Sequence, residues 1–237
     1  MVRYLARTAG ELGRETATQE KLAYMACHFS LYTTGLSNIP AALPPGSMLI
    51  LNDQIPFSGH DPHRILDQLQ ETMEHLACDS LLLDFQRPGN DETARLCHLL
   101  AAETACPLGI SHHYADALDH SVFLPPPPLD MPLEEYLKPW KNRRIWLESA
   151  LENTVFTITP KGCKADCLPY GSPQGETFIE ETLHCRYRSE VDEEKIRFYL
   201  YRTVDQLEAL LDEADTLGIE RSIGLYQQLG KRKPLVD

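Results

Sequence analysis

The chain lacks any apolar stretch long enough to cross a membrane. No window holds the roughly 18 consecutive apolar residues that a spanning helix needs. Residues 1–7 contain no apolar core of signal-peptide length. We therefore expect a cytoplasmic protein without membrane partners.

Positive charge is also scarce. Lys and Arg number 22 against 35 Asp and Glu, so the formal net charge is −13. Binding to nucleic acid or to an anionic membrane requires a basic surface. We therefore expect neither of these as the main partner. The composition leaves the oligomeric state undetermined.

Several signatures of common enzyme classes are missing. The chain contains no Gly-x-Gly-x-x-Gly, no P-loop and no Gly-x-Ser-x-Gly. These absences argue against a phosphate-cradling loop and a serine hydrolase, and we expect no cofactor. The seven cysteines are an odd number scattered through the chain, which argues against a disulfide framework.

Short apolar runs recur along the 237 residues. Most are separated by helices or helix-length segments, as in a (β/α)8 barrel. The pattern predicts a small, irregular TIM barrel of the α/β class, with an open doubly wound sheet as the alternative. We expect residues 1–20 to form only an edge strand or an arm. The eight predicted strands are 21–32, 48–51, 79–86, 106–111, 121–124, 144–148, 154–159 and 222–226.

This alternation of strands and helix-length segments ends after the seventh predicted strand. In residues 161–202, two longer segments with alternating polar and apolar residues flank Asp192, Glu193 and Glu194. Such alternation predicts an antiparallel hairpin with one solvated face. The chain is thus predicted to be one barrel domain, residues 1–237, with an inserted hairpin subdomain between strand seven and its helix.

Polar residues at strand ends are the candidate functional residues, because a TIM barrel carries its chemistry at that rim. Paired carboxylates suit glycoside cleavage, in which one acid protonates the leaving oxygen and the other acts as base or nucleophile. The alternative is that Asp53 and Asp84 only order loops. The predicted catalytic residues are Asp84, Glu148 and Asp53, and the predicted substrate-binding residues are Gln86, His112, His113, Tyr226 and Gln227.

Residues 79–86 resemble the Asp-x-x-Asp-x-Asp-x-Glu motif of family-18 glycoside hydrolases, the chitinase group. In that family the final Glu protonates the glycosidic oxygen, and the Asp two residues earlier assists the substrate's acetamido group. Asp79 and Asp84 match the first and third Asp, whereas Leu82 and Gln86 replace the second Asp and the Glu. Glutamine cannot donate a proton as a carboxylic acid does. The family carries this motif on its fourth strand, whereas it lies on the third predicted strand here.

The resemblance implies a barrel that binds or hydrolyses a carbohydrate, with a small molecule or an oligosaccharide as ligand. Gln86 implies a degenerate enzyme, or one whose acid has moved to Glu148. The alternative is a non-catalytic binding or interaction protein on the same scaffold. Five aromatic residues are candidates for stacking on sugar rings: Tyr114, Trp140, Trp146, Tyr170 and Tyr226.

Two clusters raise the question of a metal. His112, His113 and His120 would suit a metal-dependent hydrolase, but adjacent residues of an extended strand point to opposite faces. Only one of the two neighbouring histidines would then face the cleft. A second candidate set consists of Cys163, Cys167, His184 and Cys185. The histidine spacing fits no known ligand pattern, and we expect no metal at either cluster.

Overall fold

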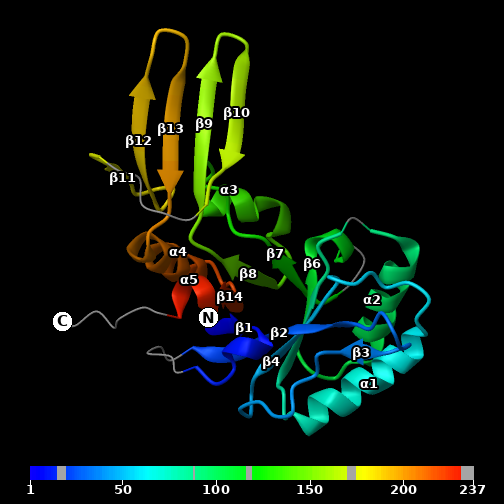
Figure 1. Ribbon diagram of the computed structural model, residues 1–237. Coiled ribbons are helices and arrows are strands. Elements are labelled where there is room, and N and C mark those ends of the chain that lie inside the picture. The colour runs from blue at the N-terminus through cyan, green and yellow to red at the C-terminus, as the bar shows by residue number, and fades with distance from the viewer. Residues whose placement is uncertain (15–19, 88, 116–118, 170–174, 231–237) are drawn as a thin grey trace, which may run out of the picture. The chain divides into compact units, whose positions relative to one another are not determined.

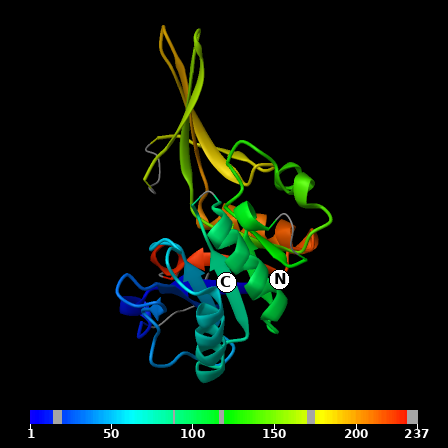
Figure 2. The same cartoon turned by 90° about the vertical axis from the view of Figure 1, so that its right-hand side faces the viewer.

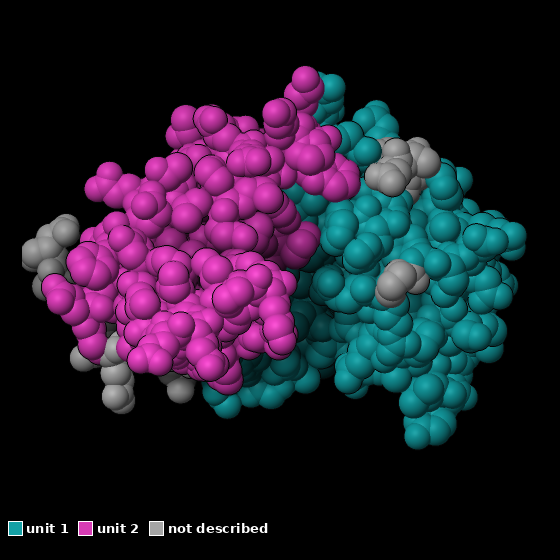
Figure 3. Space-filling view, turned by 90° about the horizontal axis from the view of Figure 1, so that it is seen from above, with its two compact units in different colours: residues 1–124, 142–148, 220–237 teal, residues 125–141, 149–219 magenta. Residues whose placement is uncertain are grey.

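The computed structural model describes residues 1–14, 20–87, 89–115, 119–169 and 175–230. No helix in these ranges is long and apolar enough to span a membrane. The chain divides into two compact units, coloured in Figure 3. The first contains Met1–Leu124, Asn142–Glu148 and Glu220–Asp237, and the second contains Pro125–Lys141 and Ser149–Ile219.

The first unit is a closed barrel of eight parallel strands (Figure 1). It closes because β1 pairs with β14 on one side and with β2 on the other. The predicted TIM barrel is therefore confirmed, and the open doubly wound sheet is excluded. Its strands are β1 (Val2–Arg7), β2 (Lys21–Phe29), β4 (Met48–Asn52), β5 (Ser80–Asp84), β6 (Leu108–Ser111), β7 (Ser121–Leu124), β8 (Ile145–Ser149) and β14 (Arg221–Leu225), with β3 (Leu36–Ser37) antiparallel beside β2.

Two strand predictions were wrong. The first residues form barrel strand β1 rather than an edge strand or an arm. Residues 154–159 belong to a separate sheet, where they pair with two antiparallel strands. With both corrections, β5 becomes the fourth strand of the barrel. The motif at residues 79–86 thus lies on the same strand as in the family it resembles.

The first unit also contains helices. They are α1 (Pro62–His75), α2 (Asp91–Glu103) and the single-turn α5 (Tyr226–Leu229), together with the short 3-10 turns η1 (Ala9–Glu11) and η2 (His112–Tyr114). Asp61 caps α1 by accepting a hydrogen bond from the His63 amide, with Pro62 at the first helical position. The cap of α2 is Asn90, whose side chain accepts a hydrogen bond from the Thr93 amide. Helix α5 directly follows β14, the last barrel strand.

Alternation along β5 builds two apolar cores. Leu81 and Leu83 point outward and pack with the buried faces of α1 and α2. Leu82 points inward and packs with Trp146 and other strand residues inside the barrel. Gly109 of β6 makes room for that indole, because a Cβ at this position would lie 2.3 Å from a Trp146 ring carbon. The barrel interior is therefore a packed core rather than a channel.

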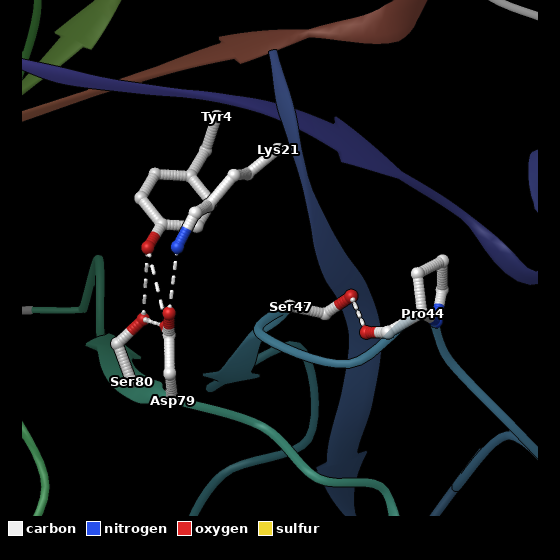
Figure 4. A network of polar contacts seen from close by, with 6 residues as sticks. All are labelled: Tyr4, Lys21, Pro44, Ser47, Asp79 and Ser80. Carbon is white, nitrogen blue, oxygen red and sulfur yellow. Dashed lines mark hydrogen bonds and ion pairs between the residues drawn. The ribbon is translucent and has the colours of Figure 1, made fainter. Parts of the chain in front are cut away.

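A polar network joins three strands at the amino-terminal end of the barrel (Figure 4). Lys21 Nζ lies 2.8 Å from Asp79 Oδ2, and the Tyr4 hydroxyl donates to Asp79 Oδ1 at 3.2 Å. Burial raises the pKa of Asp79, but hydrogen bonds from Lys21, Ser80 and Tyr4 outweigh it, so the net pKa lies below its usual value. The first aspartate of the motif therefore ties β5 to β1 and β2. In the connection before β4, Ser47 Oγ donates to the Pro44 carbonyl at 2.6 Å.

The second unit is a five-stranded antiparallel sheet with two helices and a 3-10 turn. Residues 185–191 and 196–201 form an antiparallel hairpin around residues 192–195, as predicted, but this hairpin is part of a larger sheet of five strands. Figure 2 turns this sheet by 90° from its orientation in Figure 1. Its strand order is β10-β9-β13-β12-β11. The elements are α3 (Leu133–Leu137), η3 (Lys138–Trp140), β9 (Asn153–Thr159), β10 (Gly162–Cys167), β11 (Phe178–Glu180), β12 (Cys185–Val191), β13 (Ile196–Tyr201) and α4 (Val204–Thr216).

The two faces of this sheet differ in chemistry. One face pairs Phe156 with Phe198 and Ile158 with Ile196, and it carries a cavity of about 320 Å³. The opposite face is polar: Arg188 lies 2.9 Å from Glu190, whose carboxylate also accepts a hydrogen bond from a tyrosine on β13. Strand alternation produces this division, since successive side chains point to opposite faces.

Candidate functional site

Asp84 lies at the carboxyl end of β5 on its inward face, two residues after the interior Leu82. Burial raises the pKa of Asp84, and the negative charge of Asp53 raises it further. Hydrogen bonds from Gln86 and Ser111 oppose this shift without cancelling it. Asp84 is therefore a carboxyl group that takes up a proton more readily than an exposed aspartate does.

Gln86 joins the two predicted carboxylates. Its side-chain Nε2 donates a hydrogen bond to Asp84 Oδ1, and its backbone amide donates to Asp53 Oδ1 at 3.1 Å. Asp53 Oδ2 also accepts from the Arg87 amide at 2.8 Å. Asp53 thus fixes the turn after β5, the loop-ordering role that the sequence left open. Asp53, Asp84 and Gln86 are the predicted site residues that the structure brings together.

Ser111, at the carboxyl end of β6, belongs to the same cluster. Its hydroxyl donates to the Leu83 carbonyl at 3.1 Å and accepts from the Phe85 amide at 2.9 Å. The Ser111 side chain also lowers the pKa of Asp84. Sequence reasoning placed Ser111 in a strand but not in a site. The available signal was a small polar residue ending a buried strand next to the one that carries Asp84.

Glu148 lies elsewhere on the barrel. It follows the interior Trp146 by two residues on β8, which is separated from β5 by β6 and β7. Strand alternation therefore places it on the inward face. It is half-buried. The structure thus puts this predicted acid on the same face of the barrel wall as Asp84 but three strands away.

The two neighbouring histidines differ from the prediction. His112 and His113 lie in the turn η2 rather than on an extended strand, and their ring centroids are 3.9 Å apart. The rings therefore lie against each other instead of pointing to opposite faces. This turn follows β6 directly, so both residues remain at the carboxyl end of the barrel.

Tyr226 and Gln227 start helix α5 rather than ending the last strand, because β14 stops at Leu225. The Tyr226 side chain is buried, and its ring centroid lies 4.8 Å from the Arg7 guanidinium carbon. Gln227 Nε2 donates to Glu11 Oε2 at 3.0 Å. Tyr226 thus contacts the last residue of β1, and Gln227 binds the connection that follows this strand.

The predicted aromatic candidates that the structure describes are at least partly buried. Trp146 is fully buried, and the Tyr114 ring meets Phe85 edge-on with centroids 6.0 Å apart. Tyr170 lies outside the described residues. Among the described residues, the aromatic side chain most open to solvent is one that sequence reasoning missed: Tyr32, in the connection after β2, is 94% exposed.

Within the described ranges, no group of three or more His, Cys, Asp or Glu side chains is placed to hold a metal ion. All seven cysteines are free thiols. Cys163 and Cys167 are exposed on β10, whereas Cys185 is buried on β12. His184 pairs with Glu213. The four residues considered for zinc therefore do not converge.

Comparison by sequence finds no matching protein-family model and no matching curated protein. Comparison by structure does find similar proteins. The spore cortex-lytic enzyme SleL of Bacillus cereus superimposes with a TM-score of 0.59 at 12% identity, over 98% of this chain and 72% of that chain. The chitinase-like agglutinin of Robinia pseudoacacia gives 0.59 at 12% identity over 93% of each chain.

A third similar structure is a family-18 chitinase of Cycas revoluta. It gives a TM-score of 0.57 at 12% identity over 94% of each chain. That protein is a double mutant with one Glu-to-Gln substitution, in complex with the tetrasaccharide (GlcNAc)4.

The chain thus belongs to the class of α/β barrels with polar residues at the strand ends. Within that class, it has a divergent form of the fold of family-18 chitinases and chitinase-like proteins.

Proposed function

We propose that this protein binds an oligosaccharide of N-acetylglucosamine at the carboxyl end of its barrel and does not cleave it. The observation that carries the proposal is Gln86, which occupies the motif position of the proton-donating acid. An amide side chain donates hydrogen bonds but cannot act as a carboxylic acid.

The surroundings of Gln86 suit binding. Its amide bonds to Asp84, and Asp53 fixes its backbone, so the group is held in place before a ligand arrives. Preorganised polar groups lower the entropic cost of binding. Leu82 is a buried apolar residue at the position of the motif's second aspartate. The cluster therefore retains one motif carboxylate, Asp84, beside an amide.

Two of the similar structures support this proposal. One is named an agglutinin, and the other holds (GlcNAc)4 while carrying a glutamine in place of a glutamate. A barrel of this fold thus accommodates that tetrasaccharide in a protein bearing such a substitution. We extend this binding to the present chain on the basis of the shared fold and of Gln86.

Calorimetric titration with the tetrasaccharide tests binding, and a chromogenic chitooligosaccharide tests hydrolysis. We expect saturable binding, no turnover, and about a tenfold loss of affinity in Asp84→Asn, because hydrogen bonds to a charged group are the stronger kind. The matched control is Asp79→Asn at the opposite end of the same strand, which should bind normally. Absence of binding to the wild-type protein, or equal affinity in both variants, would contradict the proposal.

Hydrolysis is the second candidate, favoured by the raised pKa of Asp84. A carboxyl group that holds its proton at higher pH is suited to act as an acid. Under this alternative, wild-type turnover would be measurable and would disappear in Asp84→Asn. If Gln86→Glu gained turnover that the wild-type protein lacked, the chain would instead be a binding protein descended from an enzyme.

A further inference from the structure

A groove opens at the carboxyl end of the barrel between the connections that follow β2 and β4. It is lined by residues 30–34 on one side and by Ile55, Pro56 and residues 58–60 on the other. Its volume is about 470 Å³, within the range of roughly 300–1,000 Å³ usual for small-molecule pockets. These residues play no part in the cluster around Asp84.

His60 holds the two walls of the groove together. Its Nε2 lies 3.1 Å from the Ser30 carbonyl oxygen on one wall, and its Nδ1 lies 2.9 Å from the Ser58 carbonyl oxygen on the other. The imidazole also packs against Phe29 and Phe57, with ring centroids 5.6 and 5.8 Å away. The groove is therefore bounded by a fixed contact between two loops.

The first wall is a turn built on Ser30. Its hydroxyl accepts hydrogen bonds from the amides of Tyr32 and Thr33 at 3.2 and 3.1 Å, and its own amide donates to the Gly35 carbonyl at 2.8 Å. These bonds hold the turn together. The turn consequently displays the side chains of Leu31 and Tyr32, which are 68% and 94% exposed.

The chemistry of the groove suits a sugar. The lining residues, all of which the structure describes, include no Lys, Arg, Asp or Glu. They offer an aromatic ring from Tyr32 beside the hydroxyl groups of Thr33, Thr34 and Ser58. A pyranose has an apolar face that can stack on a ring and hydroxyls that can hydrogen-bond, whereas an ionic ligand would find no opposite charge here.

The groove lies next to the proposed binding site, both around the barrel and along the chain. β2, β4 and β5 are adjacent strands, and Asp53, which anchors Gln86, lies two residues before Ile55 of the groove wall. Arg87 reinforces this link by donating from Nη2 to the Gln54 carbonyl at 3.0 Å. A ligand that extends from Asp84 along the rim toward β2 would therefore meet the groove.

We infer that the groove is an outer subsite, in which Tyr32 stacks on the distal sugars of an oligosaccharide whose inner end lies at Asp84. This inference rests on the proposed function and adds to it a dependence on chain length. A short ligand fills the inner site only, whereas a longer one also reaches Tyr32.

Calorimetric titration of wild type, Tyr32→Ala and Tyr32→Phe with the disaccharide and the tetrasaccharide of N-acetylglucosamine tests this subsite. We expect Tyr32→Ala to weaken tetrasaccharide binding about fivefold to tenfold, since contacts with an aromatic face contribute on this scale. Disaccharide binding should not change. Tyr32→Phe keeps the ring and should bind both ligands as the wild-type protein does.

Equal losses for both ligands, or no loss for either, would overturn the subsite while leaving the proposed function intact. If the wild-type protein bound neither ligand, the proposed function and the subsite would fail together. Because Tyr32 is 94% exposed, its replacement should not disturb folding, which unchanged melting temperatures would verify.

Discussion

The two aspartates at the ends of β5 have opposite electrostatic settings. Asp79 is held by Lys21, Ser80 and Tyr4, and its pKa is lowered. Asp84 is less accessible to water and lies beside Asp53, and its pKa is raised. The same strand therefore carries one carboxyl group whose charge stabilises the fold and one whose charge opposes it.

For Asp79, the lowered pKa predicts stabilisation above the usual aspartate pKa of about 4, which is lost as pH falls through the folded-state value. Asp79→Asn should therefore lower the melting temperature at neutral pH. The effect should be about 1–3 °C, because the ion pair with Lys21 is partly exposed and screened by solvent. Thermal melts across pH should show the difference from wild type disappearing in acid.

For Asp84, the effect of pH on stability has the opposite sign. Its raised pKa means that the folded protein favours the protonated form, so stability is lost as pH rises from the usual value through the raised one. Asp84→Asn should raise the melting temperature at neutral pH and leave it unchanged in acid. Melts measured alongside Asp79→Asn provide the matched comparison. A shift in the same direction for both variants would contradict this assignment.

At the scale of single elements, β6 and β8 depend on a close fit between Gly109 and Trp146. A methyl group at position 109 would meet the buried indole at 2.3 Å, and the indole Nε1 is held by a hydrogen bond to Glu220 at 3.2 Å. Overpacking of a core typically costs about 1–3 kcal/mol. Gly109→Ala should therefore lower the melting temperature by roughly 3–10 °C.

Gly10→Ala is the control for this substitution, because a Cβ at position 10 meets nothing within 4 Å. Combining Gly109→Ala with Trp146→Phe should cost less than the sum of the two single changes, since the smaller ring leaves room for the methyl group. Strict additivity, or a Gly109→Ala melting temperature equal to that of Gly10→Ala, would show that the fit is not tight.

Some strands could be predicted from their own sequence, and others could not. The run Leu81-Leu82-Leu83 is buried on both faces, and such a strand is recognisable from its own residues. β1 was missed because Arg3 and Arg7 interrupt its apolar pattern, although the Arg7 side chain is buried and donates to three backbone carbonyls. Residues 154–159 were correctly predicted as a strand, but alternation does not say which sheet a strand joins.

The candidate site, too, could be predicted only where local sequence carries the information. Asp84 and Asp53 were predicted as site residues because strand ends are informative in a barrel. Their connection through Gln86 depends on a turn whose geometry no local pattern encodes. Tyr32 was missed because its importance comes from exposure beside a second loop 23 or more residues later in the chain, at Ile55 and beyond.

At the scale of the whole molecule, the second unit depends on one buried cation. Arg202 is 1% exposed and donates to the carbonyl oxygens of His184 and Pro127, each at 3.2 Å. Its Nη1 also lies 3.6 Å from Glu152. The guanidinium thus joins three segments of this unit that are distant in sequence.

Arg202→Met should destabilise the second unit strongly, because loss of one partner from a buried pair costs about 3–5 kcal/mol. Hydrogen exchange should show lost protection in β12 and β13 and retained protection in β4 and β5. Arg197→Met is the matched control, since that arginine lies on the same sheet but is partly exposed, 3.8 Å from Glu190. Equal loss of protection in both units would contradict the prediction that the second unit is destabilised while the first stays folded.

The closure of the barrel by β1 and β14 has a consequence for synthesis. β1 is made first, but its second partner begins at Arg221. At a rate of synthesis of about 5–20 residues per second, one edge of β1 stays unpaired for on the order of 10–45 seconds. An open strand edge is a template for aggregation, and charged side chains suppress this. Arg3 and Arg7, which obscured the strand in the sequence, would thus help to protect the growing chain on the ribosome.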